Sequence, residues 1–299
     1  MRRSVTSLNR CLRGLMMLAV IAIAAVADAG QPARAAALVT IADGEATLID
    51  GARTLVATEG LELGGESLLR TGADTRLLRL EWPDGTAADF GPDTHAMIDP
   101  GGFGKRAGRA PAVYLLRGWL KLSSLGAAAT SGLLTPRIDL APFKGALVVM
   151  ATADETWVFA ESGSGSVAER GARPPSNLAL KPGEVYQRSG AAKGTVASRP
   201  TPGQMQRVPR GFRDSLPLRG KAFEGRSVGA RPGPPPTHAD LRAWLVAEQP
   251  LRRGFTRRFA ERARDSAFRA GLVENLSAHP EWEPVLFPER FVKPAAAAR

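Results

Sequence analysis

The clearest pattern in the sequence is an alternation of apolar and polar side chains between residues 44 and 99. In its most regular part, Leu78, Leu80 and Trp82 fall on one parity, and charged residues fill the positions between them. A period of two residues places alternate side chains on opposite faces of a β-strand. The pattern therefore predicts a half-buried strand over residues 76–82.

A tight turn follows this strand directly. Pro83 fixes its own φ angle, and Asp84 and Gly85 tolerate left-handed backbone geometry. The alternation resumes over residues 86–90, so the segment predicts a β-hairpin. Further short apolar segments predict strands at residues 46–49, 94–98, 113–122, 137–140, 146–150, 156–160, 166–168 and 184–187.

Many short strands at nearly regular spacing are typical of a β-sandwich, a β-barrel or a β-solenoid. Gly163, Ser164 and Gly165 predict a tight turn between two of these strands. We therefore expect a mainly β domain over residues 37–188. Stacked short strands leave exposed edges, and such edges commonly recruit a strand from a partner.

The composition changes at residue 189. Residues 189–236 are rich in Pro, Gly and Arg and poor in apolar side chains, so they cannot form a core of their own. They are either a linker or an extended strap laid over the β domain, with Phe212 and Phe223 as candidate anchors.

From residue 237 onward the apolar spacing becomes helical. Thr237, followed three residues later by Asp240, predicts a helix N-terminus with a variant of the capping box. Pro250 suits the first turn of a further helix. Apolar residues recur at intervals of three and four. We expect a small helical region over residues 237–293 and a frayed tail over residues 294–299.

Residues 1–36 predict an export signal. Arg2 and Arg3 begin a basic segment, and an apolar run over residues 14–27, short for a membrane span, is followed by small residues. Cleavage would release a periplasmic protein, and an uncleaved inner-membrane anchor is the alternative. The single cysteine, Cys11, precedes the apolar run, so the mature chain would contain none.

The formal net charge of the chain is +11. A positive charge favours contact with anionic surfaces or acidic proteins. Nucleic acid is not an expected partner, because an exported protein does not meet it.

The sequence contains no arrangement typical of a catalytic, cofactor-binding or metal-binding site. His95, His238 and His279 lack ligand spacing to Cys, Asp or Glu clusters and predict surface or capping positions. Residues 101–105 are similar to a phosphate loop but lack its first Gly and its Ser or Thr, so they predict a loop with at most weak anion binding. We expect a protein without enzymatic activity, metal or cofactor.

A basic cluster stands out in the helical region. Its interpretation is either a solvated face, partly paired with neighbouring acidic residues, or a docking surface for an acidic partner or an anionic envelope polymer. The cluster consists of Arg252, Arg253, Arg257, Arg258, Arg262, Arg264 and Arg269.

Several short motifs stand out in the predicted β domain. They are GEA at 44–46, the glycines at 60 and 64, SLLRTG at 67–72, LRL at 78–80, DGT at 84–86, VYLLRGWLKL at 113–122, LTP at 134–136, TWVF at 156–159 and LKPGE at 180–184. Together these motifs resemble the periplasmic FecR domain family over roughly residues 40–188. The resemblance implies a compact β-solenoid or sandwich-like module. Family members relay transport signals from an outer-membrane receptor to a cytoplasmic sigma factor. Here only a few basic residues precede the apolar run, so a stand-alone periplasmic FecR-domain protein fits better than a direct sigma-factor regulator.

We expect a non-enzymatic interaction, signalling or scaffold module of the cell envelope, with an unidentified envelope protein as its partner. Binding to an envelope glycan or the cell wall is the alternative. Exposed aromatic residues in a groove would favour the glycan, and a bare apolar strand edge would favour the protein partner. The candidate interaction residues are Asp84, Gly85, Lys105, Arg106, Arg257, Arg258 and Arg262.

Overall fold

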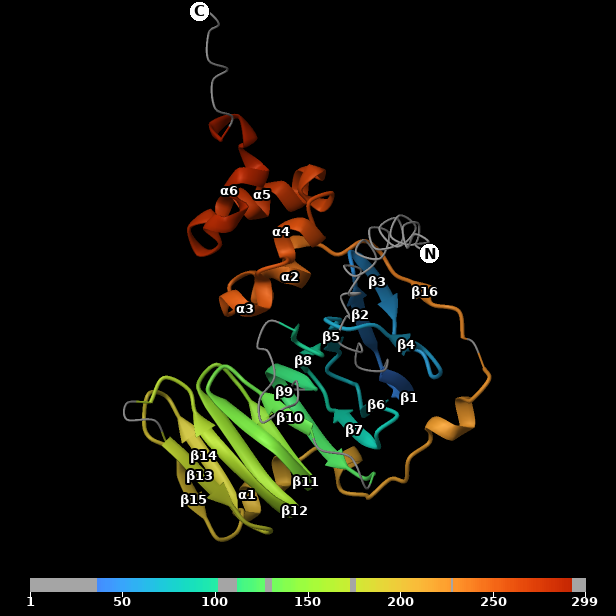
Figure 1. Cartoon of the computed structure of the whole chain (residues 1–299), viewed down its shortest axis with the longest axis vertical. Coiled ribbons are helices and arrows are strands. Elements are labelled where there is room, and N and C mark those ends of the chain that lie inside the picture. Colours follow the sequence, from blue (N-terminus) through green and yellow to red (C-terminus); the bar gives the residue numbers. More distant parts are fainter. Residues whose placement is uncertain (1–36, 102–111, 127–130, 173–175, 227, 292–299) are drawn as a thin grey trace, which may run out of the picture. The chain divides into compact units, whose positions relative to one another are not determined.

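The computed structural model describes residues 37–101, 112–126, 131–172, 176–226 and 228–291, and Figure 1 labels its elements. The fold is mainly β, as predicted, with short helices in the C-terminal region. The predicted export signal at residues 1–36 lies outside the described residues. The strands are β1 (Ala37–Asp43), β2 (Ala46–Asp50), β3 (Arg53–Val56), β4 (Glu62–Leu63), β5 (Leu68–Thr71), β6 (Leu77–Glu81), β7 (Thr86–Phe90), β8 (His95–Ile98), β9 (Val113–Ser124), β10 (Ser131–Leu134), β11 (Ile138–Ala151), β12 (Glu155–Glu169), β13 (Ser176–Leu180), β14 (Val185–Ser189), β15 (Thr195–Ala197) and β16 (Arg231–Pro232).

Hydrogen bonding joins these strands into two leaves that share three long strands. Leaf A has the order β4-β1-β6-β7-β9-β11-β12-β14-β15. Leaf B has the order β16-β3-β2-β5-β8-β9-β10-β11-β12-β13. Neighbouring strands run antiparallel, apart from the parallel pair β9 and β10. Each of the shared strands β9, β11 and β12 lies with one half in each leaf.

Glycines occur where the shared strands pass between the leaves. Gly118, Gly145 and Gly163 have positive φ angles of 100°, 116° and 74°, which glycine adopts without the strain that a Cβ would add. Gly145 of β11 pairs with Gly163 of β12. A Cβ on Gly163 would collide with the backbone carbonyl oxygen of Lys144. The two backbones therefore approach closely at this corner.

This corner corrects two of the sequence predictions. Residues 163–165 were expected to form a turn between separate strands, but they lie inside β12. The predicted strands 137–140 and 146–150 are likewise one strand, β11. A glycine at a strand bend gives the same sequence signal as a glycine in a turn, and only the pairing partner distinguishes the two.

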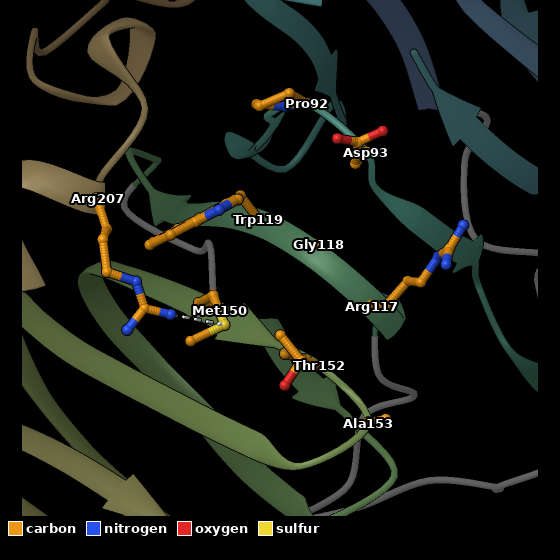
Figure 2. Close-up of a pocket in the computed structure, with 10 residues that line it drawn as sticks. Pro92, Asp93, Arg117, Gly118, Trp119, Met150, Thr152, Ala153 and Arg207 are labelled. Atoms are coloured by element: carbon orange, nitrogen blue, oxygen red, sulfur yellow. Dashed lines mark hydrogen bonds between the residues drawn. The ribbon is translucent and has the colours of Figure 1, made fainter. Parts of the chain in front are cut away.

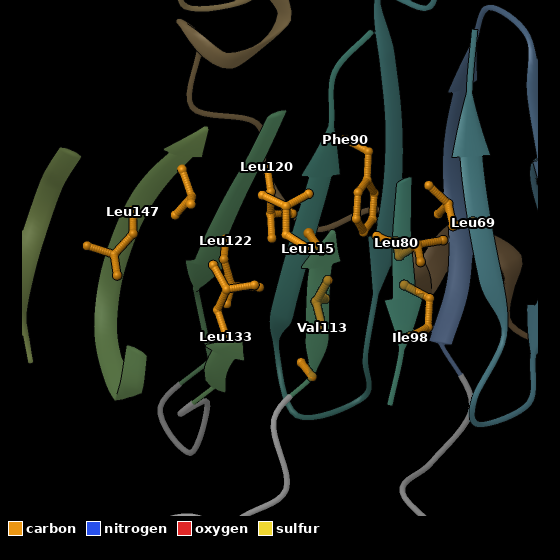
Figure 3. Packing of buried hydrophobic residues seen from close by; sticks show 14 of the residues in the cluster. Leu69, Leu80, Phe90, Ile98, Val113, Leu115, Leu120, Leu122, Leu133 and Leu147 are labelled. Carbon is orange, nitrogen blue, oxygen red and sulfur yellow. The ribbon is translucent and has the colours of Figure 1, made fainter. Parts of the chain in front are cut away.

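Apolar side chains from both leaves form one hydrophobic core (Figure 3). Leu78, Leu80 and Trp82, which form the apolar face of the predicted strand, all belong to this core. Leaf B contributes alternate residues of its own strands, such as Leu69 and Leu115. Because alternate side chains point to opposite faces, each leaf has a second, outer face.

Residues 198–236 of the Pro-rich segment form an extended strap over the outer face of leaf A. The first part of the predicted segment, residues 189–197, instead ends β14 and forms β15. Phe212 of the strap is 1% exposed and packs in a second apolar cluster with Met150, Trp157 and Val185. These three residues belong to β11, β12 and β14. Leaf A is therefore buried on both faces in this region.

Charged side chains of leaf A are also buried beneath the strap. Arg79, Glu81, Asp89 and Lys121 are each at most 4% exposed. The Arg79 Nε lies 2.8 Å from Oδ1 of Asp89. The alternation predicted a half-buried strand at residues 76–82, whereas both faces of β6 are buried, because the strap covers the polar face.

Backbone groups of the strap satisfy these charges. Lys121 Nζ donates a hydrogen bond to the carbonyl oxygen of Phe212 (2.7 Å). The carboxylate of Glu81 accepts hydrogen bonds from the backbone N–H groups of Arg219 (2.9 Å) and Gly220 (2.8 Å). Buried charges need such partners, so the contacts fix the path of the strap.

Short helices cover part of the outer face of leaf B. Trp244 and Phe259 pack in a third apolar cluster with Leu68, Met97 and Tyr114 of the leaf. The helices of the described chain are α1 (Pro202–Arg207), η2 (Arg210–Phe212), η3 (Gly220–Phe223), α2 (His238–Leu245), α3 (Gln249–Arg252), α4 (Phe255–Arg258), η4 (Arg262–Arg264), α5 (Ser266–Glu274), η5 (Leu276–Ala278), η6 (Pro280–Trp282), α6 (Glu283–Leu286) and η7 (Pro288–Arg290).

The helices α2 and α3 begin at the residues that the sequence predicted. Thr237 and Asp240 form the predicted capping box of α2, and Pro250 lies in the first turn of α3. The helical spacing over residues 251–263 is divided among α3, α4 and η4, with Gly254 between α3 and α4. Within the described ranges, no helix has the length and apolar character needed to cross a membrane.

Because two backbones approach closely at Gly163, replacing this glycine with alanine should cost more stability than replacing Gly171, which has open space around it. Gly163→Ala adds a steric collision to the strain of a positive φ angle, so we expect it to lower the free energy of unfolding by about 3 kcal/mol. Gly171→Ala is the matched control, because its φ of 73° is almost the same and a Cβ there would meet no atom within 4 Å. It should cost about 1 kcal/mol. Equal losses in urea unfolding would contradict the steric argument.

The burial of Asp89 predicts an unusual pH dependence. Burial raises the pKa of Asp89 to about 6, against the attraction of Arg79 and Lys121. Between pH 4 and 6 the folded chain therefore holds a proton that the unfolded chain has released. The free energy of unfolding falls by up to about 3 kcal/mol as the pH rises through this range. In Asp89→Asn this loss is absent. The stability of the variant relative to the wild type should therefore rise by about 3 kcal/mol between pH 4 and 7.

Urea unfolding followed by circular dichroism across this pH range measures the difference. Asp74→Asn, which removes an exposed carboxylate, is the control and should keep a constant offset from the wild type. Parallel curves for Asp89→Asn and the wild type would contradict the prediction.

Candidate functional site

Three basic residues form a row across the outer face of leaf B. Arg70 of β5 is the register partner of His95 of β8, and His95 is the register partner of Arg117 of β9. Register partners on neighbouring strands share a face and lie about 5 Å apart. The row therefore places two guanidinium groups on either side of an imidazole on one face of the leaf.

His95 is the neutral member of the row. It is 8% exposed, and burial, followed by the charges of Arg117 and Arg70, lowers its pKa to about 4. The Nη2 of Arg117 lies 3.0 Å from Nε2 of His95. Because a guanidinium can only donate, Nε2 accepts this hydrogen bond, which leaves the ring proton on Nδ1. His95 therefore orients the guanidinium of Arg117.

A cleft of about 660 Å³, here called the α2 cleft, lies over this row. Residues of β2, β3, β5 and β8 form its floor, and Gly233, Pro234, Asp240 and Trp244 line the opposite side. Arg70 connects the two sides through an ion pair with Asp240, with 3.2 Å between Nη1 and Oδ1. The cleft therefore lies between the sheet, the end of the strap and helix α2.

A second cavity of about 650 Å³, here called the Trp119 pocket, adjoins the α2 cleft (Figure 2). Asp93 and Arg117 line both cavities. Figure 2 shows Trp119, Met150 and Arg207 gathered toward the end of the pocket away from Arg117. Trp119 is half-buried, so it presents part of an aromatic ring to the pocket.

The predicted turn residues have a structural role. Asp84 Oδ1 accepts a hydrogen bond from the backbone N–H of Thr86 (2.9 Å), and Gly85 has a φ of 86°. Neither Asp84 nor Gly85 lines the α2 cleft or the Trp119 pocket. Lys105 and Arg106, the other predicted loop positions, lie outside the described residues.

The predicted helical arginines differ from one another in their contacts. Arg258 donates hydrogen bonds to the backbone carbonyl oxygens of Ile49 and Gly51, and so ties α4 to leaf B. Arg262 is half-buried and donates to a carbonyl oxygen at the end of the strap. Arg257 is exposed. Two of these three arginines therefore make internal contacts.

The histidines were expected at surface or capping positions, and the structure corrects this for His95, which is buried in β8 under the α2 cleft. His279 does cap helices, as the C-cap residue of η5 and the N-cap residue of η6. It is nevertheless fully buried, with its ring centroid 6.3 Å from that of His238. Among the described residues, no group of three His, Cys, Asp or Glu side chains is placed to hold a metal ion.

Arg70 and Arg117 are not among the interaction residues predicted from the sequence. Each directly follows two leucines, in the segments LLR at 68–70 and LLR at 115–117. A lone basic residue after an apolar strand is a weak signal by itself. Only the register of β5, β8 and β9 brings these residues together with His95.

Comparisons with known proteins leave the family open. No family model and no curated protein matches the chain. Two solved structures of candidate anti-sigma factors from Parabacteroides distasonis are similar to it. The first is 14% identical over 44% of this chain and 59% of that chain, with a TM-score of 0.36. The second is 15% identical over 40% of this chain and 55% of that chain, with a TM-score of 0.31.

The chain thus spans less than two thirds of either neighbour, and at these TM-scores we draw no inference about fold or function from them. The resemblance to the FecR domain family stays a prediction from the sequence motifs.

The geometry of the row predicts how His95 titrates. In an NMR titration, its imidazole signals should shift with a midpoint near pH 4, well below the usual value of about 6.5. The unfolded chain takes up this proton at a higher pH than the folded chain does. His95 therefore lowers the free energy of unfolding by up to about 3 kcal/mol as the pH falls from 6.5 to 4. The burial of Asp89 has the opposite effect, because it raises stability as the pH falls.

Arg117→Gln removes one of the charges that lower this pKa, so the midpoint should rise. Arg53→Gln, at an exposed position of β3, is the control and should leave the midpoint unchanged. A midpoint near 6.5 in the wild type would contradict the assigned burial and contact.

Proposed function

We propose that the protein is an exported, non-enzymatic interaction module of the cell envelope that binds an extended segment of a partner protein at the edge strand β13. The observation that supports this proposal is the open edge itself. Among the described strands, β13 pairs with β12 alone. An unpaired strand edge presents a row of backbone donors and acceptors to another chain.

The composition of β13 favours recognition. Its sequence SNLAL contains no Pro and no Lys, and its pairing with β12 runs through five consecutive residues without a bulge. Proteins usually protect exposed edges with such residues or bulges. Asn177 and Ala179 are exposed, while Leu178 is half-buried against the main core.

The strands β13 and β14 both pair with the edge of β12 that faces away from β11, and β15 is the edge strand of leaf A beyond β14. The strand β14 pairs with both β12 and β15, and Val196 of β15 is 39% exposed. The two open edges, β13 and β15, support a protein partner for the module, in signalling or as a scaffold.

A glycan is the second candidate ligand, and one observation favours it. The half-buried Trp119 lies in a pocket with Asp93, Arg117 and Arg207. An aromatic face beside charged and polar side chains suits the stacking and hydrogen bonding of a sugar ring. Cell-wall binding lost in Trp119→Ala and kept in β13 variants would favour this function over the edge-binding one.

Proline substitutions in β13 test the edge. Backbone N–H groups of consecutive strand residues point to opposite sides, so one of Leu178→Pro and Ala179→Pro removes an outward donor and leaves pairing with β12 intact. The chain would be expressed as residues 36–299 with a photo-crosslinking residue at Asn177 and recovered from the envelope of a Gram-negative host.

We expect one stoichiometric crosslinked protein at Asn177, and loss of most of that product in the proline variant that keeps wild-type thermal stability. A photo-crosslinker at the exposed Arg53 is the control and should not capture this protein. Retention by isolated cell wall without any crosslinked protein would argue against the proposal.

A further inference from the structure

The α2 cleft carries an unpaired positive charge on its floor. Arg70 is paired with Asp240, and His95 is neutral at the pH of most compartments because its pKa is lowered. Arg117 is exposed, and its contact among the described residues is with Nε2 of His95. It makes no ion pair with any described residue. The guanidinium is therefore oriented and still able to bind a carboxylate.

Two unpaired negative charges flank the same cleft. Glu45 and Asp93 are exposed and line the cleft. Both border Gly72: its N–H donates to the carbonyl oxygen of Glu45 (2.9 Å), and its carbonyl oxygen accepts from the N–H of Asp93 (3.2 Å). Neither carboxylate is in an ion pair with a described residue.

The acidic pair lies beside the basic row, not within it. Glu45 is two residues before Thr47 on β2, and Gly72 is two residues after Arg70 on β5, while Thr47 and Arg70 are register partners. Two residues along a strand keep the same face and span about 7 Å. Arg117 lies two strands from Arg70, about 10 Å across the leaf. The positive site at Arg117 and the negative site beside Gly72 are therefore about 12 Å apart, roughly the length of a tripeptide.

We propose that the α2 cleft binds a short peptide as a zwitterion, with its carboxylate on Arg117 and its ammonium group between Glu45 and Asp93. An anion without an ammonium group would bind Arg117 but face two carboxylates, and a cation would face Arg117. A zwitterion matches both sites. A cavity of about 660 Å³ accommodates a peptide of two or three residues.

Apolar residues provide surfaces for the side chains of such a peptide. Val56, Leu68 and Trp244 line the cleft beside the charged groups. The ion pair between Arg70 and Asp240 closes one part of the cleft, since it links β5 to α2. The proposal does not depend on the β13 edge, which lies on other strands.

Calorimetric titration of residues 36–299 with trialanine tests the proposal. We expect saturable binding that weakens at least tenfold when the amine is acetylated, and at least tenfold when the carboxylate is converted to an amide. Because these changes are made in the probe, the test does not depend on the folding of any variant. No saturable binding up to about 10 mM, or equal binding of the blocked peptides, would overturn the proposal.

Substitutions in the cleft test which residues bind the carboxylate and the ammonium group of the peptide. Arg117→Gln should remove the preference for a free carboxylate, and the double variant Glu45→Gln and Asp93→Asn should remove the preference for a free amine. Arg53→Gln is the control and should bind like the wild type. Peptide binding that keeps both preferences in Arg117→Gln and in the double variant would overturn the assignment. The β13 proline variants should still bind trialanine, so failure of either proposal is distinguishable from failure of the other.

Discussion

The buried charges on the outer face of leaf A hold the strap in place. Arg79 and Asp89 form an ion pair that is almost fully buried, and a charge removed from water needs partners close by. The strap supplies some of them through its backbone, since Arg79 donates to the carbonyl oxygens of Leu216 and Pro217. A segment with few apolar residues is therefore held along one path.

That path determines where the α2 cleft forms. After crossing leaf A, the strap reaches the edge of leaf B, where Arg231 of β16 pairs with Val56 of β3. Gly233 and Pro234, which follow β16, line the cleft. The contacts that satisfy buried charges under leaf A thus also bring part of the cleft wall into place on leaf B.

The strap and the helices cover parts of both leaves and so limit the surfaces at which another molecule can bind. The strap lies on leaf A, and the helices lie on part of leaf B, so the described surface of the sheets is open mainly at edges and clefts. The strand β13 is such an edge, and Arg117 stands where the α2 cleft and the Trp119 pocket meet. Protein and small-molecule binding would therefore use separate surfaces.

Features that depend on near neighbours along the chain are encoded in local sequence patterns. The alternation at Leu78 and Leu80 predicted a strand of the core, and Thr237 with Asp240 predicted the start of α2, because periodicity and capping involve residues a few positions apart. Tertiary structure alone decided that Gly163 bends a strand, that the polar face of β6 is buried, and that Arg70, His95 and Arg117 form a row. Strand register and covering segments join residues that are far apart in sequence, so no local pattern encodes them.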